Sequence, residues 1–423
     1  METSQTWIAN VEILNELLRK ETWYNTFFAK FSGNVDLSQD DNGNPVYSPS
    51  GKPIEILNGF VAEGRDNMLI PFLRELTGSP VYGDTVLKGT GEDQSMYWLR
   101  SYVNQYRKAV MKRSGQMSEQ RQKLYKLYDA ARPQLSRWFS KWENQSIFGT
   151  FYEGVSPNLS LGTASDGLGL NKRYHPNWYV LDGDVVTAVG TEQYTCTNAQ
   201  LDSAIGDGGS CDSDMNADAL LDLRVKCMEL RIPQLHSSKG HKFWVMVAHP
   251  EQVASLMKDD DYKDAQQFAF SGKMLDCPEL NGAVGYYGGF VIFEDIVGIR
   301  EWDATDVGVD GITGSFFGDS TSDRLAPSAV GTSMWNALVF GNSAVGKGVA
   351  DDLHFTDEID DHENTIEVGG ALINGYNRAD FFAEGVADES SNVFQKNQAS
   401  ASDSLSATAA TNQSSLIFCT DEG

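Results

Sequence analysis

The stretch that decides the fold is MSEQRQKLYKLYDAARPQLSRWFSKWENQSIFG, residues 117–149. Apolar side chains recur in it at steps of three and four residues, at Leu124, Leu127, Tyr128, Ala131, Leu135, Trp138 and Trp142. This period predicts a helix with one apolar stripe. Ser118 is a suitable N-cap, and Phe148 and Gly149 mark the expected end.

The predicted helix is unusually long. A rise of 1.5 Å per residue over residues 118–146 gives a rod of roughly 40 Å, more than a small domain needs for its own core. Pro133 interrupts the pattern. A proline inside a helix removes one backbone donor and clashes with the preceding turn, so we expect a kink near Asp129 or two abutting helices.

Basic residues concentrate in this helix and in the segment before it. Residues 96–141 contain eleven lysines and arginines against two acids, which leaves 22 basic and 57 acidic residues elsewhere. A basic arm on an acidic body attracts the body of a second copy, and such head-to-tail contacts close into rings or extend further. A solvated helix whose charges balance the body of its own molecule explains the same pattern equally well.

The segment before the helix predicts a long hairpin. Residues 68–76 alternate like a strand, residues 81–87 and a glycine turn at Gly89 and Gly91 follow, and residues 95–110 return. The residues expected on one face of the returning strand are Met96, Trp98, Arg100, Tyr102 and Tyr106. An isolated hairpin is marginally stable, so this one is expected to lie on a partner surface.

The totals exclude several classes of protein. A net charge of −26 argues against a nucleic-acid grip by the whole surface and against adsorption to anionic membranes. No apolar run has the length of a membrane span, and Glu2, Glu12 and Glu16 stand where a signal peptide is basic and then apolar. We therefore expect the chain to be made and kept in a cytoplasm.

The other elements follow from local patterns. Helices are expected at 6–28, 216–230, 251–258 and 262–270. Buried or alternating strands are expected at 242–248, 286–299, 365–382 and 414–420, and residues 333–340 are apolar on all sides. The segments expected to be loops or extended arms are 32–53, 150–190 and 384–412.

No motif in the chain argues for an enzyme. Residues 341–347 (GNSAVGK) have the spacing of a phosphate-binding loop, but Gly348 stands where a serine or threonine must hold magnesium, so a glycine-rich turn is preferred. Residues 212–218 alternate acids as in a calcium loop, but Ala217 and Leu223 replace the required glycine and glutamate, and a helix N-terminus explains the acids. No cofactor or metal is expected.

The spacing of cysteines and histidines also argues against a metal site. The five cysteines are widely spaced and contain no CxxC pair, so buried free thiols are expected rather than a disulfide framework or a zinc site. They are Cys196, Cys211, Cys227, Cys277 and Cys419. The six histidines have no paired ligand spacing.

Four blocks, taken in order, resemble a known family. They are LRELTGSPVYGDTVLKGTGED (73–93), RKAVMKRSGQMSEQR (107–121), ARPQLSRWFSKW (131–142) and KFWVMVAHPEQVASLMKDDDYKDAQQFA (242–269). Their succession resembles the major capsid proteins of short-tailed, podovirus-like bacteriophages. The resemblance implies an α+β chain with the Hong Kong 97-type capsid fold, and it covers residues 27–382.

The resemblance also implies a division of the chain. Residues 1–65 would form the N-arm, 66–111 the extended loop (E-loop), and 112–215 a peripheral domain with the spine helix and a loop-rich insertion. Residues 216–346 would form the axial domain, 347–385 the return to the peripheral domain, and 386–423 a Ser/Ala-rich loop and a final strand.

The function implied is self-assembly into pentamers and hexamers of an icosahedral shell around a phage double-stranded DNA genome. Contacts between subunits are expected in the E-loop at Trp98, Arg100, Tyr102, Tyr106, Arg107 and Lys108, and on the spine helix at Arg121, Lys126 and Arg137. Scaffolding, portal and decoration proteins are the expected further partners, and DNA is enclosed without sequence-specific binding. The expected location is the virion, after assembly in the host bacterial cytoplasm.

Two alternatives from other classes remain open. An encapsulin-like cellular compartment shares the fold and would enclose an enzyme cargo instead of DNA. A nucleotide-binding enzyme rests only on residues 341–347.

Overall fold

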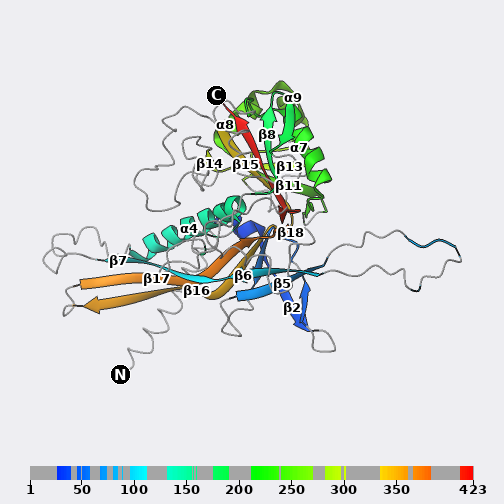
Figure 1. The fold of residues 1–423 in the computed structure, drawn as a ribbon. Helices are drawn as coiled ribbons and strands as arrows, with labels where there is room; N and C mark the ends of the chain where they lie inside the picture. Colours follow the sequence, from blue (N-terminus) through cyan, green and yellow to red (C-terminus); the bar gives the residue numbers. More distant parts are fainter. Residues whose placement is uncertain are drawn as a thin grey trace, which may run out of the picture.

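The computed structural model divides the chain between two main sheets, with helix α4 (Ala131–Glu153) lying along one of them (Figure 1). The structure describes residues 26–39, 45–48, 50–57, 67–73, 80–83, 88, 96–111, 131–154, 156, 159, 175–189, 211–237, 240–269, 282–296, 300–301, 334–360, 365–382 and 410–422. The predicted α+β class is confirmed.

The first sheet has five strands in the order β1-β4-β16-β17-β7. Their bounds are β1 Ser32–Asn34, β4 Ile54–Leu57, β16 Val345–Asp360, β17 Thr365–Arg378 and β7 Asn104–Met111. β16 and β17 form a long antiparallel hairpin from Val345 opposite Arg378 to Asp360 opposite Thr365. β7 pairs with the other side of β17 and is the edge strand.

Sequence reasoning missed β16. No strand was predicted there, because acids dominate the composition of residues 351–363. In the structure Leu353 and Phe355 are buried, while Asp352, His354 and Thr356 are exposed. This alternation is the signature of a strand with one buried face, and the acids occupy its solvent side. The predicted strand at 365–382 is confirmed as β17 and β18 (Phe381–Phe382).

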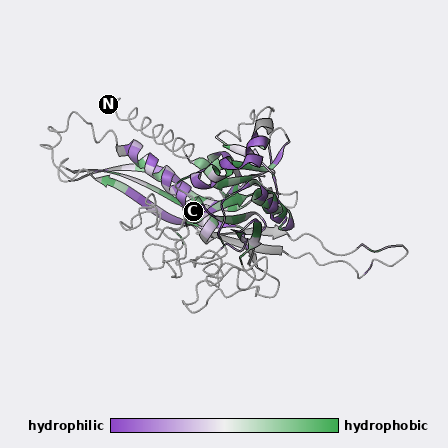
Figure 2. Ribbon diagram, turned by 90° about the horizontal axis from the view of Figure 1, so that it is seen from above, coloured by the Kyte–Doolittle hydropathy of each residue, from purple (hydrophilic) through white to green (hydrophobic). Residues whose placement is uncertain are grey.

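Helix α4 packs on this sheet through a small apolar cluster. Leu135 and Phe139 of the helix contact Leu353, Phe355, Val368 and Leu372 of the sheet. Trp138 and Trp142 stack at 5.8 Å between ring centroids. Hydrophilic residues dominate the side of α4 that is seen from above in Figure 2. The predicted apolar stripe is confirmed for the second half of the helix, and residues 117–130 with the expected kink lie outside the described residues.

The helix does not end at Gly149 as predicted but continues to Glu153. Its last turns are buried, because Phe148 and Phe151 pack on Phe28 and Phe340 with ring centroids 4.8–6.1 Å apart. Phe28 belongs to the short helix η1 (Phe27–Phe31). The aromatic end of the predicted N-terminal helix therefore fills the core where α4 ends, while residues 6–25 of that helix lie outside the described part.

The second sheet has nine strands and two core layers. Its order is β12-β13-β11-β15-β20-β8-β9, with β10 beside β11 and β14 beside β15. The bounds are β12 Gly285–Tyr287, β13 Phe290–Glu294, β11 Lys242–Ala248, β15 Met334–Phe340, β20 Ser415–Asp421, β8 Trp178–Asp182, β9 Val185–Ala188, β10 Leu235–His236 and β14 Arg300–Glu301.

Strand β11 shows why this sheet is covered on both faces. Phe243 and Val245 belong to one buried cluster and Trp244 and Met246 to the other, so the run is apolar at almost every position. One face carries helix α7 (Ala217–Glu229), which starts at an Asn216 cap, as well as α8 (Pro250–Lys258) and α9 (Asp260–Ala269). The predicted elements at 216–230, 242–248, 251–258 and 262–270 are confirmed.

The C-terminal strand β20 lies inside this sheet, between β15 and β8. The prediction of a last strand at 414–420 is confirmed. The expected loop at 150–190 is wrong for residues 178–188, which form β8 and β9. The buried run Trp178–Leu181 and the turn at Gly183, with φ of +59°, were the overlooked signals of a hairpin.

The predicted extended arm at 32–53 contains short strands instead. β1 pairs in parallel with β4, and β2 (Asp36–Gln39) pairs with β3 (Pro45–Ser48) as a separate hairpin. A last small pair joins β18 to β19 (Ala410–Thr411). The remainder of the loop expected at 384–412 lies outside the described residues, apart from residues 410–412.

Candidate assembly surface and buried polar junction

The predicted hairpin is present as β5 (Asn67–Leu73) and β6 (Met96–Tyr102). These strands pair antiparallel from Asn67 opposite Tyr102 to Leu73 opposite Met96. Trp98 and Arg100 lie at register positions opposite Pro71 and Leu69. Residues 81–83, which were expected to begin another strand, form none.

The returning run 95–110 was expected to be one strand, but it divides at Val103 into β6 and β7, which belong to different sheets. Val103 is buried beside Leu57, which anchors the chain at the point of division. Gly375 makes this crossing possible, because a Cβ there would lie 2.1 Å from the Tyr102 carbonyl oxygen. Met96 to Tyr106 therefore do not form one continuous face.

Two of the predicted contact residues pack inside their own chain. Tyr102 is only 7% exposed and contacts Leu159. The Tyr106 ring lies under α4, 6.1 Å from the Phe139 ring and 5.7 Å from the Trp142 ring. Burial raises the pKa of the Tyr106 hydroxyl well above its usual range. The structure thus gives both tyrosines a packing role.

The predicted cations on β7 and α4 are exposed. Arg107 and Lys108 are neighbours on the edge strand, so their side chains leave opposite faces of the sheet. Lys108 Nζ lies 5.5 Å from the centre of the Trp138 ring, on the α4 side. Arg137 and Lys141 are exposed on α4. We call Arg107, Lys108, Arg137 and Lys141 the basic surface. Arg121 and Lys126 lie outside the described residues.

The lysine of the phosphate-loop-like sequence is committed to a buried ion pair. Lys347 belongs to strand β16, and its Nζ lies 3.3 Å from Glu143 Oε1 of α4. Asn374 Nδ2 donates to the same carboxylate oxygen at 3.2 Å. The chain at 341–347 is a turn followed by a strand, so the preferred interpretation of this motif is confirmed and the lysine is not displayed to solvent.

The polar residues at 212–218 have structural roles, and Asp218 lies in the first turn of α7. Asn216 Oδ1 accepts a hydrogen bond from the Ala219 amide at 2.7 Å as the cap of α7, and Asp212 accepts one from the Gly183 amide at 3.0 Å. Among the residues that the structure describes, no group of three or more His, Cys, Asp or Glu is placed to hold a metal ion. Within the described residues, no helix is long and apolar enough to cross a membrane.

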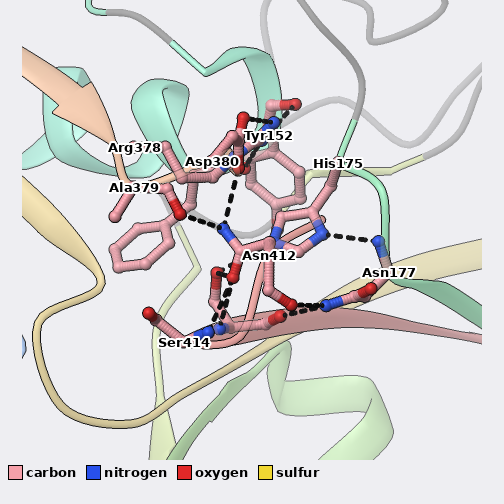
Figure 3. Close-up of polar contacts among 10 residues, drawn as sticks. Tyr152, His175, Asn177, Arg378, Ala379, Asp380, Asn412 and Ser414 are labelled. Carbon is pink, nitrogen blue, oxygen red and sulfur yellow. Dashed lines mark hydrogen bonds and ion pairs between the residues drawn. The ribbon is translucent and has the colours of Figure 1, made fainter. Parts of the chain in front are cut away.

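A buried polar junction joins the two sheets, and sequence reasoning missed it entirely (Figure 3). Arg378, at the end of β17, is fully buried and binds Asp380 through two hydrogen bonds of 2.8 Å each. Its Nη1 also donates to the carbonyl oxygens of Phe151 and Tyr152 in the last turn of α4. The last carbonyls of a helix are the ones that need partners from outside it, so Arg378 caps the end of α4 while Asp380 neutralises its charge.

Asn412 connects this ion pair to the last strand. Its Nδ2 donates to Asp380 Oδ1 at 2.9 Å, and its Oδ1 accepts from the amides of Ser414 and Ser415 at 2.8 Å each. Asn412 lies 32 residues after Asp380 in the sequence and shares no motif with the Arg378–Asp380 pair. An arginine and an aspartate two residues apart at a strand end were the sole local hint.

His175 completes the junction in its neutral form. Its Nδ1 accepts from the Asn177 amide at 3.1 Å, so the proton must lie on Nε2, which is 2.8 Å from Ser415 Oγ. The Ser415 hydroxyl in turn donates to Asn412 Oδ1. Burial, and then the positive charge of Arg378, hold the pKa of His175 well below its usual range.

Comparison with solved structures identifies the fold. The capsid of Ralstonia phage GP4 is similar with a TM-score of 0.59 at 16% identity, covering 94% of this chain and 91% of that chain. The acid-stable capsid of Helicobacter pylori bacteriophage KHP30 has a TM-score of 0.56 at 10% identity, covering 94% and 91%. The cyanophage Pam1 capsid has a TM-score of 0.54 at 15% identity, covering 93% of this chain and 92% of that chain. At these identities the likeness shows the fold, which is the Hong Kong 97-type capsid fold expected from the resemblance.

The comparison with protein families is independent of the structure. No curated protein matches the chain significantly. A family model described as phage capsid protein matches residues 49–392 of the 423. The match covers more than half of the chain, including the hairpin β5–β6, helix α4 and most of both sheets. The chain therefore belongs to the phage capsid protein family.

Proposed function

We propose that copies of this major capsid protein join head to tail into pentamers and hexamers, with the basic surface of one subunit facing acids of the next. The icosahedral shell that they form places the chain in the virion. The proposal concerns the surfaces that make the contacts. It rests on one observation, which is the concentration of exposed cations on β7 and α4 and of exposed acids on α7–α9.

The acidic partner surface lies on helices α7–α9. The exposed acids there are Asp218, Asp222, Glu229, Glu251, Asp260, Asp261 and Asp264. The basic residues on the same helices are Arg224, Lys226, Lys258 and Lys263. The basic surface lies on the edge strand β7 of the other sheet and on α4; the exposed acids of that sheet, Asp351, Asp352 and Glu358, lie on β16. Opposite charges on two different surfaces of one chain favour a heterologous contact between copies. Such a contact closes into a ring when the rotation between successive copies allows it.

The two main sheets suggest new residue bounds for the expected domains. We assign the five-stranded sheet and α4 to the peripheral domain, and the nine-stranded sheet with α7–α9 to the axial domain. Residues 178–188 and 415–421 then join the predicted axial segment 216–346, because β8, β9 and β20 are strands of the same sheet. β1 and β4 of the predicted N-arm at 1–65 and β7 of the predicted E-loop at 66–111 join the peripheral domain, because they are strands of the five-stranded sheet.

Further partners follow from the shell role. We propose that the shell encloses double-stranded DNA without sequence-specific binding and that assembly takes place in the host bacterial cytoplasm with scaffolding, portal and decoration proteins. The negative charge of the chain supports a shell that does not adhere to its packed DNA.

Charge reversal tests the assembly surface. The variant Arg107→Glu with Lys108→Glu should remain folded and fail to form capsomers, because like charges would face one another. Circular dichroism checks the fold, and mass photometry with negative-stain microscopy checks assembly. Lys242→Glu, an exposed reversal at the start of β11 and outside both proposed contact surfaces, is the matched control and should assemble. Normal shells from the double variant would refute the proposed role of the basic surface.

The expected contact residue Arg100 is tested in the same way. Arg100→Glu combined with Arg107→Glu is predicted to give a folded but assembly-defective subunit. The separate variant Arg100→Lys with Arg107→Lys should assemble like the wild type. This result separates an effect of charge from an effect of removing the arginine side chains.

A further inference from the structure

Two buried thiols lie side by side where the last strand meets the segment that leads into α7. Cys211 Sγ lies 3.4 Å from Cys419 Sγ, and both residues are almost fully buried. Both belong to the core layer on the α4 side of the nine-stranded sheet. Cys227, the third described cysteine, is buried in the opposite core layer.

Hydrogen bonds donated by backbone amides fix the register between the two segments. The Asp421 amide donates to the Ser213 carbonyl oxygen at 3.1 Å, two residues beyond Cys419 and Cys211 respectively. The Met215 amide donates to the Glu422 carboxylate at 3.2 Å. The segments therefore run in the same direction with equal spacing, and the two cysteines occupy adjacent positions. A disulfide needs the sulfur atoms to approach to about 2.05 Å, which small side-chain rotations can supply.

We propose that Cys211 and Cys419 form a disulfide bond under oxidising conditions and thereby hold β20 covalently in the nine-stranded sheet. The oxidant is a small peroxide that can enter a packed core. Hydrogen peroxide oxidises one thiol to a sulfenic acid with release of water. The second thiol attacks that sulfur and a second water leaves, so two thiols and one peroxide give one disulfide and two waters.

The order of the two steps follows from the surroundings. Burial raises the pKa of the Cys419 thiol well above its usual range, so its thiolate is disfavoured. The first oxidation therefore falls to Cys211, which lies in the irregular segment before α7 and not inside a central strand. The reaction is slow and depends on local opening of that segment.

The position of β20 gives the bond its effect. β20 pairs with β15 over seven residues and with β8 over three, so its departure would separate β8 and β9 from the rest of the sheet. The bond closes a long loop from residue 211 to residue 419, which restricts the unfolded chain. If the capsid role above holds, the subunit is assembled with free thiols and gains this bond after release from the reducing cell.

Peptide mapping tests the proposal on the full-length protein purified in reductant. After treatment with hydrogen peroxide, digestion without reductant should yield one linked peptide pair containing Cys211 and Cys419. The thermal midpoint of the oxidised protein should be several degrees higher, and reductant should reverse the shift. Cys227→Ala, the matched control, should retain both results, whereas Cys211→Ala should lose both.

Three results would overturn the inference. The first is recovery of Cys211 and Cys419 as unlinked thiols, alkylated after denaturation of the peroxide-treated protein. The second is a link through Cys196, Cys227 or Cys277 instead. The third is a linked pair without any rise in the thermal midpoint, which would disprove the stabilisation of β20. If Cys211→Ala fails to fold, the wild-type peptide map and melting curves decide alone.

Discussion

Gly370 shows how one missing side chain sets the distance between α4 and its sheet. A Cβ at this position would lie 2.5 Å from Phe139 Cε2 and 3.2 Å from Phe355 Cε1. Gly370→Ala should therefore lower the free energy of unfolding by about 1–3 kcal/mol through overpacking. Gly369→Ala is the matched control, since its nearest neighbour would be Thr356 Oγ1 at 3.4 Å. Urea unfolding of both variants measures the difference, and equal stability would contradict the close approach.

His175 gives the stability of the subunit a defined pH dependence. Its pKa is lowered in the folded state, so below its ordinary value of 6.5 the unfolded chain binds a proton that the folded chain does not. The contribution is complete above about pH 6.5, and stability is lost as pH falls, by about 1.4 kcal/mol per pH unit. His175→Gln should flatten this part of the profile. Unfolding midpoints between pH 7 and pH 5 test the prediction, and identical slopes would refute it.

At the scale of elements, the C-terminal strand holds the second sheet together. Phe418 is fully buried in the core layer under α7 and pairs with Ala337 of β15. Phe418→Ala should cost about 3–5 kcal/mol of unfolding free energy through the cavity that it leaves. Gln413→Ala, at an exposed position before the strand, should change it by less than about 0.5 kcal/mol. A small effect of Phe418→Ala would mean that β20 contributes little to the core.

The junction between elements depends on charge balance rather than on the arginine alone. Arg378→Met should destabilise the chain by about 3–5 kcal/mol, because it leaves the carboxylate of Asp380 buried without its cation. Adding Asp380→Leu should recover part of that loss, since both charges are then gone. Urea unfolding of the single and double variants gives the coupling. A double variant that is no more stable than Arg378→Met alone would contradict the role of charge balance.

For the whole molecule, the separated charges predict salt-sensitive association. Raising the ionic strength from about 0.05 M to about 0.5 M shortens the Debye length to a few ångströms and should shift capsomers towards single subunits. Mass photometry across this range measures the shift. The wild type should lose association steeply, whereas a variant that is already assembly-defective should show no further change. Salt-independent capsomers would mean that apolar contacts dominate the interface.

Prediction from the sequence succeeded where a pattern is local. The strand 242–248 and the helix at 216–230 were predictable because their signals lie within a few residues. β16 was missed because its acids masked a period of two, and β8 was missed because a glycine-rich neighbourhood concealed a short buried run. The basic character of β7 and α4 was predicted from the composition. The burial of Tyr102 and Tyr106 depends on the division of residues 95–110 into β6 and β7 at Val103, which no local pattern indicates.

The amino-acid sequence alone determined the local periods, the helix at 216–230, the separation of basic and acidic segments and, through four ordered blocks, the resemblance to capsid proteins. Only the tertiary structure decided that β20 enters the middle of a sheet, that Lys347 is buried against Glu143, and that Arg378 meets Asn412. Helix and strand patterns depend on neighbours within a few residues. Strand order, buried ion pairs and thiol contacts depend on residues that are distant in the chain and become neighbours only when the core packs.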